Sequence, residues 1–247
     1  MYKFFVNPEN ITDTTIEIIG SDVNHIKNVL RMKQDENVLI SDGMGNEYLC
    51  KISGINNEKV ETEIIEEKKA ETELPAKIYL FQGLPKSDKM ELIIQKAVEL
   101  GVYEIIPVAT KRAVVKLNEK KAEAMVMRWN LISKSAAKQS KRAVIPTVKN
   151  VMDFEQALRY AKDMDAVIIP YEEAQGMERT RAIISEVSNC KSIAVFIGPE
   201  GGFEESEIKR AEETGAKPIT LGKRILRTET AGIMVLSVLA YHMEDNT

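Results

Sequence analysis

Two short loops near the C-terminal end of the chain carry residues whose types and spacing could bind a small ligand. The first is IGPEGGF at residues 197–203, and the second is LGKRILRTETAG at residues 221–232. Each follows an expected strand and precedes an expected helix. The glycines of the first loop allow a backbone to approach a ligand closely. The two arginines of the second loop, Arg224 and Arg227, stand beside a helix start that is already electropositive.

The loops alone leave two interpretations open. They match neither the GxGxxG nor the GxxxxGK[ST] phosphate-binding pattern, so neither a dinucleotide nor a nucleoside triphosphate is indicated. They could form a cofactor pocket, or they could be ordinary strand-to-helix turns. In the same way, Arg224 and Arg227 could reach a ligand or could pair with acids such as Glu200 and Glu229.

The charge of the chain is unevenly distributed. The formal net charge is −4, but residues 111–149 carry eleven Lys and Arg against two acids. The segments 1–75 and 150–247 are acidic, at −7 and −6. Such an island could be a solvated helix face. The scarcity of compensating acids favours instead a localised field that binds an anionic partner such as RNA.

Composition excludes several other classes. With 44% hydrophobic and 29% charged residues, the 247-residue chain is typical of a soluble globular protein. The apolar runs are too short to span a bilayer, and the N-terminus does not match a secretory signal, so a cytoplasmic location is expected. Cys50 and Cys190 are far apart without CxxC spacing, and no metal site is expected.

The N-terminal third alternates short β-like runs with turns. Strands are expected at residues 37–41, 47–52 and 60–65, with a short helix at 25–32 that turns Ile26, Val29 and Leu30 inward. Many short strands with little helix favour a small barrel. The polar stretch 66–73 is the expected linker, which gives a first domain at 1–72 and a second at 73–247.

From residue 77 onward the pattern becomes strand–helix alternation, which predicts an α/β domain with a parallel sheet and helices on both faces. Open α/β sheets bind ligands at the carboxyl ends of their strands. The expected strand ends near residues 170, 197 and 221 would therefore share one pocket. Trp129 could stack on a base, but a lone Trp on a helix is more typical of a core. Strands are expected at 77–82, 104–108, 144–148, 166–169, 193–197 and 219–221, and helices at 88–100, 120–141, 179–187, 204–214 and 229–243.

Several motifs in one order identify a resemblance. With the two loops, the segments KSDKMELIIQKAVELGV (86–102), TKRAVVK (110–116) and AAKQSKRAVIP (136–146) are similar to the ribosomal small-subunit (16S) RNA uridine-N3 methyltransferase family. That family belongs to the SPOUT superfamily, and the resemblance covers nearly the whole chain. Ser87 and Ala113 stand where Gly and Ser are also common, which puts no activity in doubt.

The resemblance implies a fold, a cofactor and an assembly. It implies an N-terminal PUA-like β-barrel, a C-terminal SPOUT domain threaded into a trefoil knot, a homodimer, and S-adenosylmethionine bound at the knot. Backbone groups of Gly198, Leu221 and Leu226 would hold the adenosine, with Ile197 and Ile225 as apolar walls. The implied cofactor residues are Pro170, Tyr171, Ile197, Gly198, Gly201, Gly202, Leu221, Gly222, Ile225, Leu226, Thr228 and Thr230.

The implied activity is methylation of N3 of a uridine in 16S rRNA, with the small ribosomal subunit as partner. Arg227 is the candidate that stabilises the uracil anion, and Glu200 is either a general base or a residue that pins its loop. Methylation of another RNA, such as a tRNA, and a non-catalytic RNA-binding assembly role remain alternatives. The expected RNA contacts are Arg31, Lys86, Lys89, Arg112, Lys116, Gln139 and Arg142.

Overall fold

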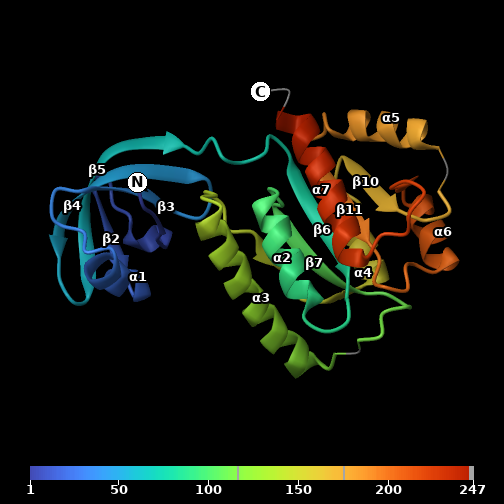
Figure 1. The fold of residues 1–247 in the computed structure, drawn as a ribbon, viewed down its shortest axis with the longest axis horizontal. Coiled ribbons are helices and arrows are strands. Elements are labelled where there is room, and N and C mark those ends of the chain that lie inside the picture. Colours follow the sequence, from blue (N-terminus) through green and yellow to red (C-terminus); the bar gives the residue numbers. More distant parts are fainter. Residues whose placement is uncertain (116, 175, 245–247) are drawn as a thin grey trace. The chain divides into compact units, whose positions relative to one another are not determined.

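The computed structural model describes residues 1–115, 117–174 and 176–244. The chain divides into two compact units (Figure 1). We call Met1–Glu73 together with Ala137–Ile145 the N-terminal unit, and Leu74–Ala136 together with Pro146–Thr247 the C-terminal unit.

The N-terminal unit is built on a curled five-stranded sheet with the order β1-β3-β4-β5-β2. Its pairs are antiparallel except for β1 with β3. Alternating apolar residues, such as Ile16 and Ile18 of β2 and Val38 and Ile40 of β3, are buried in one core. The strands are β1 (Lys3–Phe5), β2 (Thr15–Ile19), β3 (Asn37–Ser41), β4 (Asn46–Ile55) and β5 (Lys59–Lys69), and a 3-10 turn lies at Pro8–Asn10.

The short helix of this unit differs from the expected one. It begins as α1 (Ser21–Asn24) and continues as a π-helical turn at His25–Val29, in which Leu30 N donates to His25 O at 2.8 Å. A π turn is wider than an α turn, so it rotates the following positions around the axis. Ile26 is buried as expected, but Val29 is 62% exposed, and its predicted inward position was wrong.

The segment 137–145 belongs to the N-terminal unit through buried polar contacts. The Glu73 carboxylate accepts hydrogen bonds from Ala143 N (2.9 Å) and Val144 N (3.2 Å) and pairs with the buried Arg142 guanidinium. Ser41 Oγ also donates to Ala143 O at 2.8 Å. The structure thus differs from the single break expected after residue 72. Half of the expected linker is strand as well, because β5 runs to Lys69 and pairs with β4.

The C-terminal unit is a parallel sheet with the order β12-β10-β11-β6-β7-β8, and β9 pairs with β7. The strands are β6 (Lys77–Gly83), β7 (Glu104–Ala109), β8 (Thr147–Val148), β9 (Met152–Asp153), β10 (Ala166–Pro170), β11 (Ser192–Ile197) and β12 (Lys217–Ile219). The helices that begin in this unit are α2 (Lys89–Glu99), α3 (Glu119–Gln139), α4 (Phe154–Ala161), α5 (Met177–Val187), α6 (Glu205–Glu213) and α7 (Thr228–Glu244).

Helices cover this sheet on both faces, as predicted from the strand–helix alternation. Helix α7 packs against α2 and β11. Residues of α4 and α6 share a core with Phe81 of β6 and Phe196 of β11, whose rings stack at 4.3 Å. Trp129 of α3 is 2% exposed, which confirms its interpretation as a core residue. None of the helices in the described ranges is both long enough and apolar enough to cross a membrane.

The buried pair of Glu73 with Arg142 predicts a pH-dependent stability. Burial alone would raise the pKa of Glu73, but the hydrogen bonds and charge of Arg142 and the N–H groups of Ala143 and Val144 lower it below its usual range. A carboxyl group whose pKa is lower in the folded state than in the unfolded state stabilises the fold. This stabilisation is fully present at pH values above the unfolded-state pKa of about 4.3, and it is lost as the pH falls through the lower pKa of the folded state. At pH 7, Glu73→Gln should therefore reduce the free energy of unfolding of the N-terminal unit by about 2 kcal/mol.

Amide hydrogen exchange in β4 and β5 measures this change. The difference between wild type and Glu73→Gln should shrink as the pH falls below about 4. The exposed Glu71→Gln is the matched control. Equal protection in the two variants at pH 7 would contradict the assigned role of Glu73.

Candidate active site

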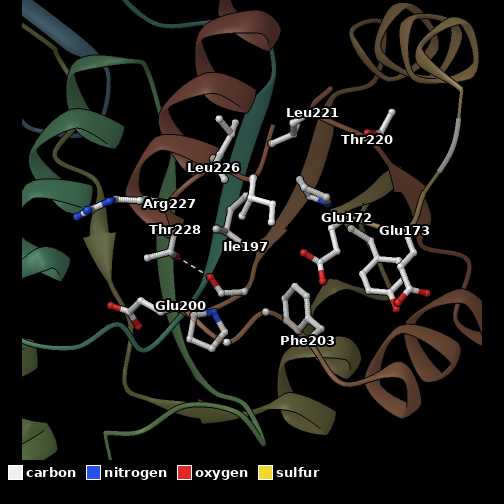
Figure 2. Close-up of a pocket in the computed structure, with 18 of the residues that line it drawn as sticks. Glu172, Glu173, Ile197, Glu200, Phe203, Thr220, Leu221, Leu226, Arg227 and Thr228 are labelled. Carbon is white, nitrogen blue, oxygen red and sulfur yellow. Dashed lines mark hydrogen bonds between the residues drawn. The ribbon is translucent and has the colours of Figure 1, made fainter. Parts of the chain in front are cut away.

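A cavity of about 750 Å³ opens where β10, β11 and β12 end (Figure 2). Its walls are the loops at residues 197–203 and 220–228, together with residues 170–173, which begin at the last residue of β10. The structure thus brings together the three strand ends that the sequence predicted would share a pocket. Of the expected cofactor residues, only Thr230 does not line the cavity. The cavity residues among them are Pro170, Tyr171, Ile197, Gly198, Gly201, Gly202, Leu221, Gly222, Ile225, Leu226 and Thr228.

Close backbone packing explains the glycines of the 197–203 loop. Gly202 N donates to Pro199 O at 2.9 Å and closes a turn. A Cβ on Gly198 would lie 3.1 Å from the Gly202 backbone, and Gly202 itself has a φ of +67°. A Cβ on Gly83, at the end of β6, would lie 2.6 Å from Pro199 Cδ. The loop therefore folds tightly on itself and against β6, in a conformation that side chains at these positions would prevent.

A chain of hydrogen bonds ties the two long loops to the sheet. Gln82 Nε2 donates to Thr228 Oγ1 at 2.8 Å, and Thr228 Oγ1 donates to Gly198 O at 2.6 Å (dashed in Figure 2). Gln82 is fully buried and Thr228 is 5% exposed. Thr228 is itself the first residue of α7, and its hydroxyl joins the two loops. Gln82 was not predicted; its only signal is an amide at the end of a buried strand.

Glu200 is held at the cavity by Lys89. Lys89 Nζ lies 3.0 Å from Glu200 Oε1 and 3.5 Å from Glu229 Oε2, and Lys86 N donates to Glu200 Oε1 at 3.1 Å. Partial burial would raise the pKa of Glu200, but Lys89 and the backbone donors lower it below its usual value. A carboxylate with a lowered pKa is a weaker base, so the arrangement favours the loop-pinning role. Glu200 and Glu229 therefore pair with Lys89, whereas the sequence suggested Arg224 or Arg227 as their possible partners.

Charged side chains lie on two sides of the cavity. In Figure 2 the Arg227 side chain extends on the side of Glu200, whereas Glu172 and Glu173 lie on the other side. Glu205 completes the acidic lining, and none of these three acids was predicted. Burial together with the hydrogen bond and charge of Glu173 raises the pKa of Tyr171. Across the described ranges no group of three or more His, Cys, Asp or Glu is arranged to hold a metal ion.

The expected RNA contacts have different environments. Arg142 is 4% exposed and paired with Glu73, so the prediction that it contacts RNA is corrected to a structural role. Ile225 was expected as an apolar wall of the cofactor pocket and not as an RNA contact; it lines the cavity, but its side chain is 88% exposed. Lys116 lies outside the described residues. Lys89 is half-buried in its ion pairs. The exposed members of the set are Arg31 and Gln139 in the N-terminal unit and Lys86 and Arg112 in the C-terminal unit.

Comparison with known proteins defines the class. Residues 72–240 match the model of an RNA methyltransferase domain, and residues 18–65 match that of an RNA methyltransferase PUA domain. The solved structure of a ribosomal RNA small subunit methyltransferase E from Neisseria gonorrhoeae, bound to S-adenosyl methionine, has a TM-score of 0.82 and 33% identity, and covers 97% of this chain and 96% of that one. The predicted fold class, a SPOUT domain with a PUA-like domain, is confirmed.

Two further relatives identify the family. The Bacillus subtilis protein of the same name is 41% identical over 93% of this chain and 91% of its own length. A Legionella pneumophila methyltransferase structure in complex with S-adenosylmethionine has a TM-score of 0.81 and 31% identity, with 96% of each chain covered. The chain belongs to the ribosomal RNA small subunit methyltransferase E family of RNA methyltransferases.

The hydroxyl of Thr228 should be essential to the site architecture. Thr228→Val keeps the shape but removes the group that bonds both Gln82 and Gly198. Because buried polar groups then lose their partner, we expect the free energy of unfolding to fall by about 1–3 kcal/mol. Thr228→Ser retains the hydroxyl and is the matched control. Chemical denaturation measures both variants, and equal stability of Thr228→Val and wild type would contradict this role.

Proposed function

We propose that this protein methylates N3 of a uridine in the 16S rRNA of the small ribosomal subunit, with S-adenosylmethionine as methyl donor. The observation that carries the proposal is the cavity at the ends of β10, β11 and β12, in a chain whose relatives include structures bound to S-adenosylmethionine. Family membership supports the rRNA substrate. The choice of N3 rests on the motif resemblance alone.

The residues of the cavity fit this cofactor. Its volume of about 750 Å³ is within the usual range for small-molecule sites. Ile197, Leu226 and Phe203 offer apolar contacts for an adenine ring. The tight turn at Gly198 and the backbone at Leu221 would supply hydrogen bonds. When bound, S-adenosylmethionine supplies an electrophilic methyl group on its sulfonium.

The protein's own residues then have two tasks. One is to hold the uracil so that N3 faces the methyl group, which lowers the barrier by orientation. The other is to favour loss of the N3 proton. The Arg227 guanidinium, exposed at the cavity, is suited to stabilise the negative charge that develops on the uracil ring. Glu200 acts indirectly, because its bond with Lys89 fixes the loop beside the reacting groups.

The RNA must present the target uridine unpaired, because Watson–Crick pairing occupies N3. Lys86 and Arg112 are exposed on loops of the C-terminal unit, and Arg112 also lines the cavity. We propose that they contact the phosphates that flank this uridine, and that Lys89 and Lys116 add to the same field. Arg31 and Gln139 would bind RNA from the N-terminal unit.

Three further properties complete the proposal. We propose that the loop at 220–228 and α7 form the threaded end of a trefoil knot, supported by the Thr228 link to Gly198. We propose a homodimer, supported by apolar residues such as Leu92 of α2 and Tyr241 of α7, which are 44% and 68% exposed. The proposed domains are residues 1–72 and 73–247, with the segment 137–145 of the second packed into the N-terminal unit. The proposed location is the cytoplasm, where bacterial ribosomal RNA is found.

Nucleoside mass spectrometry of rRNA tests the function. In a strain that lacks this gene, 3-methyluridine should be lost from the small-subunit rRNA, and wild-type protein should restore it. Arg227→Ala should fold normally but turn over about 10²-fold more slowly, as expected when one donor to a developing anion is removed. Arg181→Ala, an exposed arginine on α5, is the matched control.

Other outcomes would favour the alternatives. Unchanged rRNA with a methyl group lost from tRNA would indicate another RNA substrate. Unchanged nucleosides together with no S-adenosylmethionine binding would indicate an assembly factor. A normal single-turnover rate in Arg227→Ala would remove this residue from the mechanism.

The salt dependence of RNA binding tests the contacts. Each phosphate neutralised by a Lys or Arg contributes roughly 0.7–0.9 to the slope of log K against log salt. The double reversal of Lys86 and Arg112 to Glu removes two such contacts, so it should weaken binding to small subunits and flatten this slope by about 1.4–1.8. Lys162→Glu, on the surface after α4, is the control. An unchanged slope in the double variant would place the RNA elsewhere.

A further inference from the structure

Glu207 of α6 is a buried carboxylate that lies outside the cavity lining. It is 3% exposed. Its Oε1 accepts a hydrogen bond from Lys111 N at 3.0 Å, and its Oε2 accepts one from Glu204 N at 2.9 Å. The two donors belong to different loops, the one after β7 and the one between β11 and α6. One carboxylate therefore bridges the start of the basic segment and the loop that lines the cavity.

The two loops also touch directly beside this bridge. Arg112 Nη1 donates to Gly201 O at 3.1 Å, and a Cβ on Gly201 would lie only 3.2 Å from Arg112 Cβ. Lys111 Nζ reaches Ser206 Oγ at 3.0 Å. A turn closed by Ala113 N to Thr110 O, at 3.1 Å, fixes the backbone on either side of Arg112. The position of Arg112 at the cavity is therefore set by contacts that involve the backbone on either side of it, and one of these, from Lys111 N, ends on the buried Glu207 carboxylate.

The charge of Glu207 is suited to this role. A carboxylate in the first turn of α6 is stabilised by the helix N-terminus, and its two backbone hydrogen bonds offset the cost of burial. A glutamine has the same shape, but its amide nitrogen cannot accept a hydrogen bond, so Glu207→Gln must lose one of the two. A guanidinium has five N–H donors, so the bond of Arg112 to Gly201 O leaves capacity for a phosphate.

We propose that Glu207 is a positioning residue for the RNA substrate. Its carboxylate holds the Lys111 backbone so that the Arg112 guanidinium stands at the mouth of the cavity, where it binds a phosphate next to the target nucleotide. This inference rests on the proposed function. It assigns a role in RNA binding to a residue that does not line the cavity and that carries a negative charge, which RNA repels. If Glu207 only capped α6, the effect of its substitution on RNA binding would not depend on whether Arg112 is present.

A double-mutant cycle of Glu207→Gln and Arg112→Ala tests the proposal, because residues that act through one another have non-additive effects. The measured quantities are kcat and KM for methyl transfer to small subunits from the gene-deleted strain, and the Kd for S-adenosylmethionine by calorimetry. Each single variant should lower kcat/KM about tenfold, mainly through KM. A tenfold change in kcat/KM corresponds to about 1.4 kcal/mol, which is typical of one lost hydrogen bond to a charged group. The double variant should be no worse than Arg112→Ala alone.

Three controls make the outcome decisive. Glu212→Gln, on the exposed side of the same helix, should retain wild-type kinetics. Glu207→Asp keeps the charge at the helix start but is one methylene too short to reach both donors, so it should reproduce the KM effect even if Glu207→Gln proves unstable. The Kd for S-adenosylmethionine should stay within about twofold of wild type in the two Glu207 variants, which a loosened cofactor loop would not allow.

If the two effects multiply, the double variant loses about 100-fold in kcat/KM. This result would overturn the proposal, because it would show that Glu207 and Arg112 act independently. Wild-type KM in Glu207→Asp, or a loss confined to cofactor affinity, would also overturn it and leave the proposed function intact. Absence of any methyl transfer by wild-type protein would overturn the proposed function and this role together.

Discussion

The site depends on one constraint, which is that loops from parallel strands must meet at a single edge of the sheet and stay together. The Thr228 hydroxyl provides that connection, because it accepts from Gln82 at the end of β6 and donates to Gly198 after β11. The side chains of Gln82 and Thr228 are both buried, so these bonds are costly to leave unmade. The cavity exists because this link holds the loops at 197–203 and 220–228 against each other while their glycines allow close packing.

Charge has separate tasks in the two units. The basic segment 111–149 looks uniform in sequence, but the structure divides it. Arg142 is buried against Glu73 and stabilises the N-terminal unit, whereas Arg112 is exposed at the cavity of the C-terminal unit. Lys89 is shared between Glu200 and Glu229. Among the described residues, only part of the positive charge is therefore exposed and unpaired with an acid, and within that part the Arg112 guanidinium bonds to Gly201 O of the loop at 197–203.

Strand–helix alternation predicted the α/β class and the convergence of three strand ends, because it is a local signal of the sequence. The individual residues of the cavity lining were expected only from the motif resemblance. It missed Gln82, Glu207 and the acidic lining, because their roles depend on contacts between residues far apart in the chain. The exposure of Val29 follows from a π turn, which changes the helical period without a sequence signal. The burial of Arg142 follows from Glu73, nearly seventy residues earlier in the chain.

The proposed function requires that the cavity at the ends of β10, β11 and β12 bind S-adenosylmethionine. Calorimetric titration of the purified protein with S-adenosylmethionine tests it most directly, with Gly198→Val as the comparison, since a side chain there would meet the Gly202 backbone. The account predicts saturable binding to wild-type protein and loss of binding in the folded variant. No binding to wild type, or equal binding to both proteins, would contradict it.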